Sequence, residues 1–270
     1  MLKQRIITAA VLIPLVILGI FYLPLPWFNI IAAAILLWAA WEWGQLIGLS
    51  REASRWGYLL ITILVFLLFH YLPAVVILPL AIITWAVLTY LVFNYQQFIR
   101  FWSSSFWLRV ILGWWVLGLA WYGLVFIRAQ ALGAGLLLLL LLWVWGADIG
   151  AYFCGRRWGK HKLAPQISPG KSIEGLAGGL LVTLLIGAIA GVFFSPSLAY
   201  YISLLILALL VALISVIGDL FESMLKRQAG VKDSGQLLPG HGGILDRIDS
   251  LLSAAPVFAA GMLLLTSRFH

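Results

Sequence analysis

The sequence is poor in charged residues and contains a single cysteine. Only 10% of its 270 residues are charged, whereas 64% are hydrophobic, and a soluble domain is typically about one quarter charged. So few charges cannot cover a water-facing surface, which excludes a soluble globular enzyme, a disordered chain and a fibrous repeat. The single Cys154 excludes a disulfide framework and any metal site built from several cysteines.

Long apolar runs predict an all-α polytopic membrane protein with about nine transmembrane helices. A helix needs roughly 20 mainly apolar residues to cross the bilayer. Lipid offers no hydrogen-bond partners, so each span must satisfy its own backbone N–H and C=O groups by forming a helix. The second and third runs are short. The candidate spans are 6–22, 27–41, 57–72, 74–93, 110–127, 132–153, 175–194, 198–221 and 251–266.

The basic residues predict the orientation of these spans. With the N-terminus in the cytoplasm, all 17 Lys and Arg residues except Arg128 and Arg268 fall in cytoplasmic segments. Cytoplasmic loops of membrane proteins carry such an excess of Lys and Arg. We therefore expect a cytoplasmic N-terminus and a C-terminus outside.

The polar residues are concentrated in the second half of the chain. Of the nine acidic residues, only Glu42 and Glu52 precede Asp148. Residues 1–130 are interpreted as a transmembrane scaffold and residues 131–270 as a transmembrane catalytic region. Two polar loops of this region, 154–174 and 222–250, are expected to face the cytoplasm.

Four carboxylates of the second half lie inside apolar spans or at their ends. Ionisable groups there are costly and usually functional, although each could instead form an interhelical salt bridge. Asp246 and Asp249 are three residues apart and share a helix face, and the preceding loop returns them to the membrane level of Asp219. Paired oxygen ligands without nearby His or Cys favour Mg²⁺ over Zn²⁺. The fourth carboxylate is Asp148.

The loop between Asp219 and Asp246 combines cations with glycines. Cations beside carboxylates suit a metal–polyphosphate site, because the metal bridges phosphate oxygens and Lys or Arg neutralises the remaining charge. Glycines allow backbone N–H groups to approach a phosphate closely. An ordinary basic loop with capping acids is the simpler alternative. The residues concerned are Lys226, Arg227, Lys232, His241, Gly242, Gly243 and Arg247.

The earlier polar loop contains Gly170-Lys171-Ser172, which looks like the end of a phosphate-binding P-loop. Pro165 stands where the first glycine of that motif belongs, and no strand is expected before it, so the P-loop interpretation is rejected. Ser172 is instead predicted to cap the following span, with Glu174 in its first turn.

That span carries small residues at every fourth position, which predicts close helix packing within the protomer or between protomers. The small residues are Gly175, Gly179, Thr183, Gly187 and Gly191.

Residues 223–249 resemble the signature of the phosphatidate cytidylyltransferases (CDP-diacylglycerol synthases). The resemblance rests on Ser223, Leu225, Lys226, Arg227, Lys232, Asp233, Gly235, Leu238, Pro239, His241, Gly242, Gly243, Ile244, Asp246, Arg247, Ile248 and Asp249. The upstream loop is similar to the family's through Asp148, Ala151, Tyr152, Gly155, Gly159, Lys160, His161, Lys162, Leu163, Pro165, Ser168, Pro169, Lys171, Glu174 and Gly175. Gly170 departs from the pattern, because relatives often carry a second lysine there.

The resemblance implies transfer of CMP from CTP to phosphatidic acid, giving CDP-diacylglycerol and pyrophosphate. Asp219 and Asp246 would bind Mg²⁺, alone or with a second metal ion. The implied catalytic residues are Asp219, Asp246, Lys226, Arg227, Lys232, His241, Arg247 and Asp249. The implied substrate-binding residues are Lys160, Lys162, Ser168, Lys171, Ser223, Asp148, Glu174, Gly242 and Gly243.

The same resemblance implies partners and a location. We expect CTP, phosphatidic acid and membrane lipids as partners, no nucleic acid, and either a monomer or a homodimer. The expected location is the bacterial inner membrane, with the active site facing the cytoplasm. Two alternatives stay open: a CTP-dependent lipid kinase, which would attack the γ-phosphorus and release CDP, and an anion transporter.

Overall fold

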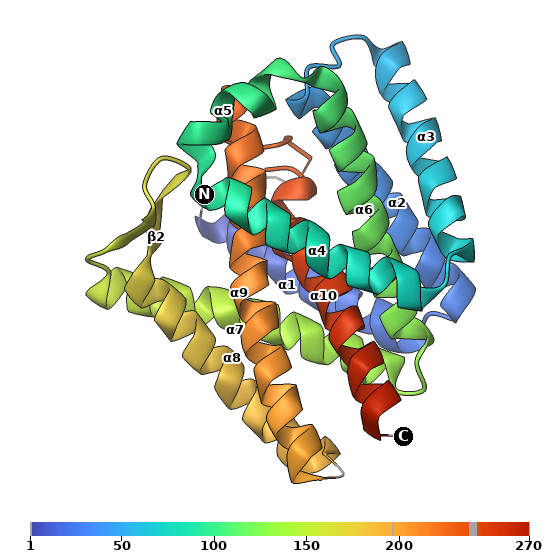
Figure 1. The fold of residues 1–270 in the computed structure, drawn as a ribbon, viewed down its shortest axis with the longest axis vertical. Coiled ribbons are helices and arrows are strands. Elements are labelled where there is room, and N and C mark those ends of the chain that lie inside the picture. The colour runs from blue at the N-terminus through green and yellow to red at the C-terminus, as the bar shows by residue number, and fades with distance from the viewer. Residues whose placement is uncertain (1, 196, 238–241, 270) are drawn as a thin grey trace.

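The computed structural model describes residues 2–195, 197–237 and 242–269, and this part of the chain is almost entirely helical (Figure 1). The elements in order are α1 (Leu2–Tyr22), α2 (Leu25–Leu46), α3 (Glu52–Tyr71), α4 (Ala74–Phe93), α5 (Tyr95–Ser104), α6 (Phe106–Ala129), α7 (Gly133–Trp158), β1 (Lys162–Ala164), β2 (Ser168–Ser172), α8 (Ile173–Phe194), α9 (Leu198–Gln228) and α10 (Leu245–Phe269).

The helices confirm the predicted all-α polytopic membrane protein. Among the described residues, 8 helices are long and apolar enough to cross a membrane, and Ala10–Tyr22 of α1 is a shorter apolar helix. The second and third runs, short in the sequence, lie within full-length helices of 22 and 20 residues. Polar residues at the ends of these helices, such as Glu42 and Glu52, shortened the predicted spans.

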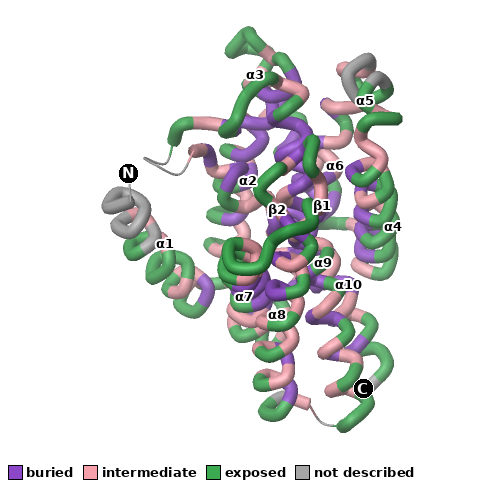
Figure 2. Tube along the Cα trace, turned by 90° about the vertical axis from the view of Figure 1, so that its left-hand side faces the viewer, coloured by how far each residue is buried: buried purple, intermediate pink, exposed green. Residues whose placement is uncertain are grey.

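The core of the bundle lies where α9 and α10 pack against α2, α4, α6 and α7. Trp43, Trp85, Trp143, Phe221 and Phe258 are completely buried there. Buried positions concentrate in this central region, whereas α1 lies along one side of the bundle, and its described side chains are mostly exposed or half-buried (Figure 2). The apolar residues that face outward on the other helices are those expected to contact lipid.

The predicted small-residue stripe of α8 packs within the protomer. A Cβ atom on Gly179 would lie only 2.6 Å from the Ala147 carbonyl oxygen of α7, and one on Gly191 would lie 2.5 Å from the Tyr201 ring of α9. Small residues therefore allow α8 to approach both neighbouring helices. Ser172 accepts a hydrogen bond from the Gly175 N–H at 3.1 Å, which confirms it as the N-cap of α8.

The two polar loops contain more regular structure than the sequence indicated. Helix α9 continues past the predicted end at residue 221, and α10 begins before the predicted residue 251. Asp219, Glu222 and Lys226 consequently share one face of a continuous helix. In the other loop, β1 and β2 form a short antiparallel hairpin in which Lys162 pairs with Ser172.

Candidate active site

A cavity of about 300 Å³ lies between α7, α9 and α10, and only polar side chains line it. We call it the charged cavity. It is lined by Asp148, Asp219, Lys226, Asp233, Asp246, Arg247, Asp249 and Ser250. The structure thus brings together all four carboxylates that the sequence singled out, with two of the predicted cations.

Asp219 lies on the part of α9 that faces this cavity. Its Oδ2 atom lies 2.7 Å from Lys171 Nζ of β2, and its Oδ1 atom accepts a hydrogen bond from the Ser223 hydroxyl at 3.3 Å. The side chains of Lys171 and Asp219 stay 23% and 30% exposed. The pair is therefore open to exchange, so that a ligand could take the place of either partner.

Asp246, in contrast, is enclosed by donors from the protein. Its Oδ1 atom lies 2.6 Å from Lys226 Nζ. Its Oδ2 atom accepts from the Ser234 N–H and hydroxyl, both at 2.9 Å, and from the Gly243 N–H at 2.8 Å. This carboxylate holds the 229–244 loop against the first turn of α10.

Lys226 links Asp246 to a further acidic residue, Glu222. The ammonium lies 2.5 Å from Glu222 Oε2, and Glu222 is completely buried. A buried cation is tolerated only when it is paired in this way. Lys226 thus lies between the carboxylate of Asp246, which lines the charged cavity, and that of Glu222, which does not.

A second cavity, of about 390 Å³, adjoins the charged cavity at Asp148 and lies under the hairpin. We call it the hairpin cavity. Most of its wall is apolar or glycine, and its cations are Arg156 and Lys171. It is lined by Asp148, Ala151, Tyr152, Gly155, Arg156, Leu163, Gly170, Lys171, Ser172, Gly175, Leu176 and Val216.

Glu174 anchors the hairpin that covers this cavity. It accepts hydrogen bonds from the backbone N–H groups of Lys160 and His161 at 3.1 and 3.2 Å, and it lies 2.6 Å from His161 Nδ1. On the other side of the hairpin, Arg227 Nε donates to the Ile167 carbonyl oxygen at 3.4 Å. Glu174 thus connects the hairpin to α8, and Arg227 connects it to α9.

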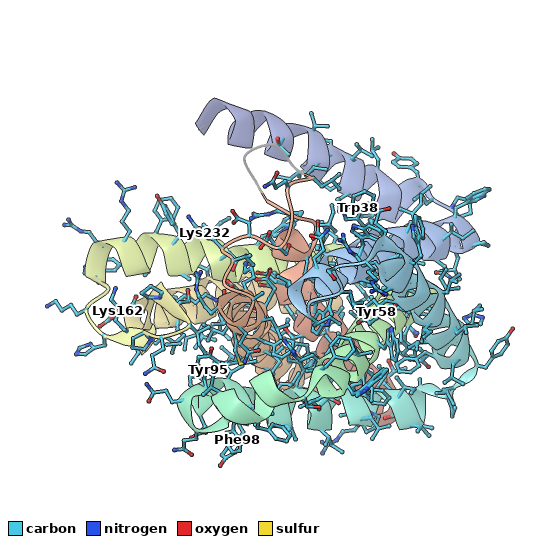
Figure 3. All side chains as sticks on the ribbon, turned by 90° about the horizontal axis from the view of Figure 1, so that it is seen from above. Trp38, Tyr58, Tyr95, Phe98, Lys162 and Lys232 are labelled. Atoms are coloured by element: carbon cyan, nitrogen blue, oxygen red, sulfur yellow. The ribbon has the colours of Figure 1, made fainter. Side chains whose placement is uncertain are left out.

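Several predicted site residues lie outside the two cavities. Lys160, Lys162 and Lys232 are exposed, and Lys162 lies on the hairpin at one edge of the molecule (Figure 3). The Gly243 N–H, expected at a phosphate, donates instead to Asp246. Ser168, Ser223, Glu174, Arg227 and Gly242 do not line either cavity. His241 lies outside the described residues.

Comparison with known proteins identifies the family of the chain. The profile of the Cytidylyltransferase family matches residues 3–265. The chain belongs to this family. It is 45% identical over 262 residues to the phosphatidate cytidylyltransferase of Pseudomonas aeruginosa, covering 96% of each chain. It is 38% identical over 283 aligned positions to that of Haemophilus influenzae, covering 96% of this chain and 98% of the relative. The family resemblance expected from residues 223–249 is thereby confirmed.

Four residues at or near the site were given no role in the sequence analysis, although Asp233 belongs to the stretch that carries the family resemblance. Asp233 and Ser250 line the charged cavity, Glu222 pairs with Lys226, and Glu42 contacts the 229–244 loop. The i, i+4 spacing of Glu222 and Lys226 was a usable signal. Glu42 lies one residue beyond the predicted span 27–41 but inside α2, and an acidic residue within a membrane helix is itself a reason to suspect a role.

Proposed function

We propose that this protein transfers CMP from CTP to phosphatidic acid, releasing pyrophosphate and forming CDP-diacylglycerol. The observation that carries the proposal is that two unlike cavities share Asp148 in their linings and are connected by the Lys171–Asp219 ion pair. The charged cavity, lined by five carboxylates and two cations, suits a polyphosphate bound together with divalent metal, and the hairpin cavity suits an anionic lipid headgroup. Membership of the cytidylyltransferase family supports the nucleotide and the lipid as substrates.

The charged cavity is the proposed site of the CTP phosphates. Arg247 is exposed at its wall and presents a planar group that can form two parallel hydrogen bonds to a phosphate. The lipid phosphate then attacks the α-phosphorus of CTP. A new P–O bond forms as the bond to the β-phosphate breaks, and pyrophosphate leaves. Because a phosphate monoester is already nucleophilic, the protein chiefly positions the reactants and neutralises charge.

The hairpin cavity is the proposed site of the phosphatidate headgroup. Arg156 and Lys171 supply positive charge for its phosphate, and Tyr152, Leu176 and Val216 supply an apolar wall for the adjoining part of the lipid. Lys171 also pairs with Asp219 of the charged cavity at 2.7 Å. It therefore lies where the lipid phosphate and the α-phosphate of CTP would meet.

Mg²⁺ is the proposed cofactor, and the donors of the charged cavity fit it. Among the described residues, no group of three or more His, Cys, Asp or Glu side chains is arranged as a ready set of metal ligands. Mg²⁺ commonly takes only one or two carboxylates and completes its coordination with water and substrate phosphates. Asp219 fits this role best, because its side chain stays partly exposed; Asp246 is retained as a second proposed ligand. Bound Mg²⁺ would neutralise charge on the CTP phosphates.

The orientation and location are proposed with the reaction. CTP is soluble, so the charged cavity must open to the compartment that holds nucleotides. The distribution of Lys and Arg supports a cytoplasmic site in a bacterial inner membrane.

The purified protein tests this function directly. It should incorporate CTP labelled at the α-phosphate into a lipid product in the presence of phosphatidic acid and Mg²⁺, with one pyrophosphate released per product. Release of CDP, with the γ-phosphate transferred to the lipid, would identify a lipid kinase and refute the proposal.

A matched pair of variants tests the two-cavity assignment. Arg156→Ala should raise the KM for phosphatidic acid and leave the KM for CTP unchanged, because Arg156 lines only the hairpin cavity. Arg157→Ala is the control, because Arg157 is the next residue in the sequence and its exposed side chain lines neither cavity. Equal effects of the two substitutions would contradict the assignment.

A further inference from the structure

A buried carboxylate from the N-terminal half contacts the loop between α9 and α10, from which Asp233 lines the charged cavity. Glu42 lies on α2 and is 2% exposed. Its Oε1 atom accepts the Ile244 N–H at 3.0 Å, and its Oε2 atom accepts the Leu245 N–H at 2.8 Å and the Ser234 hydroxyl at 3.0 Å. Every described hydrogen bond of this side chain therefore goes to the loop or to the start of α10.

Two of these donors are backbone groups that α10 cannot satisfy itself. The Ile244 carbonyl oxygen accepts the first bonds of the helix, from the N–H groups of Arg247 and Ile248. The N–H groups at such a helix start have no partner within the helix, and a negative charge is favourable there. Glu42 thus acts as the cap of α10, although it lies about two hundred residues earlier in the chain.

Two glycines of the loop, Gly235 and Gly243, lie close against the Glu42 carboxylate. A Cβ atom on Gly235 would lie 2.5 Å from Glu42 Oε1, and one on Gly243 would overlap Glu42 Oε2. Any larger residue at either position would displace the carboxylate or the loop. The closeness that these glycines allow serves a protein carboxylate, whereas the sequence had suggested a phosphate.

Ser234 connects Glu42 to the cavity. Its hydroxyl lies 3.0 Å from Glu42 Oε2 and 2.9 Å from Asp246 Oδ2. Asp246 lines the charged cavity and is followed on the same helix by Arg247 and Asp249. Glu42 itself is not part of the cavity lining, so it can act on a substrate only through these residues.

We propose that Glu42 is a positioning residue of the reaction. It holds Ser234 and Ile244 of the loop and the first turn of α10 so that Asp246, Arg247 and Asp249 face the CTP phosphates. The inference rests on the proposed function, and it makes the N-terminal half part of the active site instead of a scaffold alone. The hairpin cavity has no contact with Glu42, so recognition of the lipid should not depend on it.

Glu42→Gln is the informative substitution. The side chain keeps its size, but one acceptor oxygen becomes an NH₂ group that faces N–H or O–H donors. Losing one hydrogen bond to a charged group corresponds to about a tenfold change in an equilibrium. We expect the KM for CTP and the Mg²⁺ concentration for half-maximal activity each to rise by about that factor, while the KM for phosphatidic acid stays as in the wild type. Glu52→Gln, at the exposed start of α3, is the matched control and should behave as the wild type.

Ser234→Ala provides an independent second variant. It removes the link between Glu42 and Asp246 without touching the α10 cap, and should raise the KM for CTP in the same direction. Because the two residues share one of these contacts, the double variant should be less impaired than the product of the single effects. If Glu42→Gln does not fold, Ser234→Ala alone carries the same measurement.

The outcomes separate this inference from the proposed function. A wild-type protein that forms no CDP-diacylglycerol refutes the function. An active wild type with unchanged KM for CTP in Glu42→Gln, or in Ser234→Ala if the first variant is unfolded, overturns the positioning role. A lower apparent kcat with every KM unchanged also overturns it, because loss of folded protein reduces the active fraction and leaves KM values unaltered.

Discussion

Asp219→Asn and Asp246→Asn should differ in stability, although the sequence presents both residues as equivalent metal ligands. Asp246 accepts four hydrogen bonds through its two oxygen atoms, one of them from the ammonium of Lys226. An asparagine amide has only one acceptor oxygen, so in either orientation its NH₂ group faces a donor. Asp219 has a single ion pair, which is partly exposed.

The expected magnitudes follow from these surroundings. A hydrogen bond to a charged group contributes about 1.5–3 kcal/mol, and an unpaired buried group adds a penalty of similar size. We therefore expect Asp246→Asn to lower the free energy of unfolding by about 3 kcal/mol. Asp219→Asn loses a pair worth about 0–1 kcal/mol and keeps an acceptor for the Ser223 hydroxyl. The difference of about 2 kcal/mol is roughly 30-fold in the folding equilibrium.

The assay combines melting curves of the detergent-solubilised variants with turnover and Mg²⁺-dependent CTP binding. Asp219→Asn should melt close to the wild type but lose turnover and the Mg²⁺ dependence of CTP binding. Asp246→Asn should melt clearly lower and also lose turnover. Equal melting temperatures for the two variants would refute the structural reasoning. Substantial activity with an unchanged Mg²⁺ dependence would show that the substituted carboxylate is not a metal ligand.

Two further predictions concern the phosphates and the topology. Arg247→Lys keeps the charge but loses the planar group, so it should reduce turnover by about tenfold or more; near-normal turnover would make Arg247 an ordinary surface cation. Lys160 and Lys232 should react with a membrane-impermeant label only from the cytoplasmic side, and a reporter fused to the C-terminus should be active outside. A cytoplasmic C-terminus would show that the number of spans has the wrong parity.

The family and the general architecture could be predicted from the sequence. Apolar runs of bilayer length report membrane helices directly, because each helix satisfies its own backbone. The signature at residues 223–249 carries its residue types and gaps within one continuous stretch, and the match of the family profile over residues 3–265 confirms it. Helix ends were less accurate: α9 and α10 extend into the polar loop, because polar residues near the water interface can still be helical.

Which site residues meet was decided by the tertiary structure. The sequence singled out Asp148, Asp219, Asp246 and Asp249 by their cost in an apolar span, and packing of α7, α9 and α10 gathers them in one cavity. The ion-pair partners of these carboxylates, however, come from segments that are distant in the sequence. Lys171 reaches Asp219 from the hairpin, and these pairings leave no local pattern in the chain.

Glu42 shows most clearly what the sequence determined and what only the tertiary structure decided. The sequence showed only an acidic residue directly after the predicted span 27–41, and the structure places it inside α2, where a charge is costly. The partners that offset this cost are backbone N–H groups of Ile244 and Leu245, which every residue except proline possesses. Because a backbone donor has no identity in the sequence, only the packing of α2 against the start of α10 determined what this carboxylate holds.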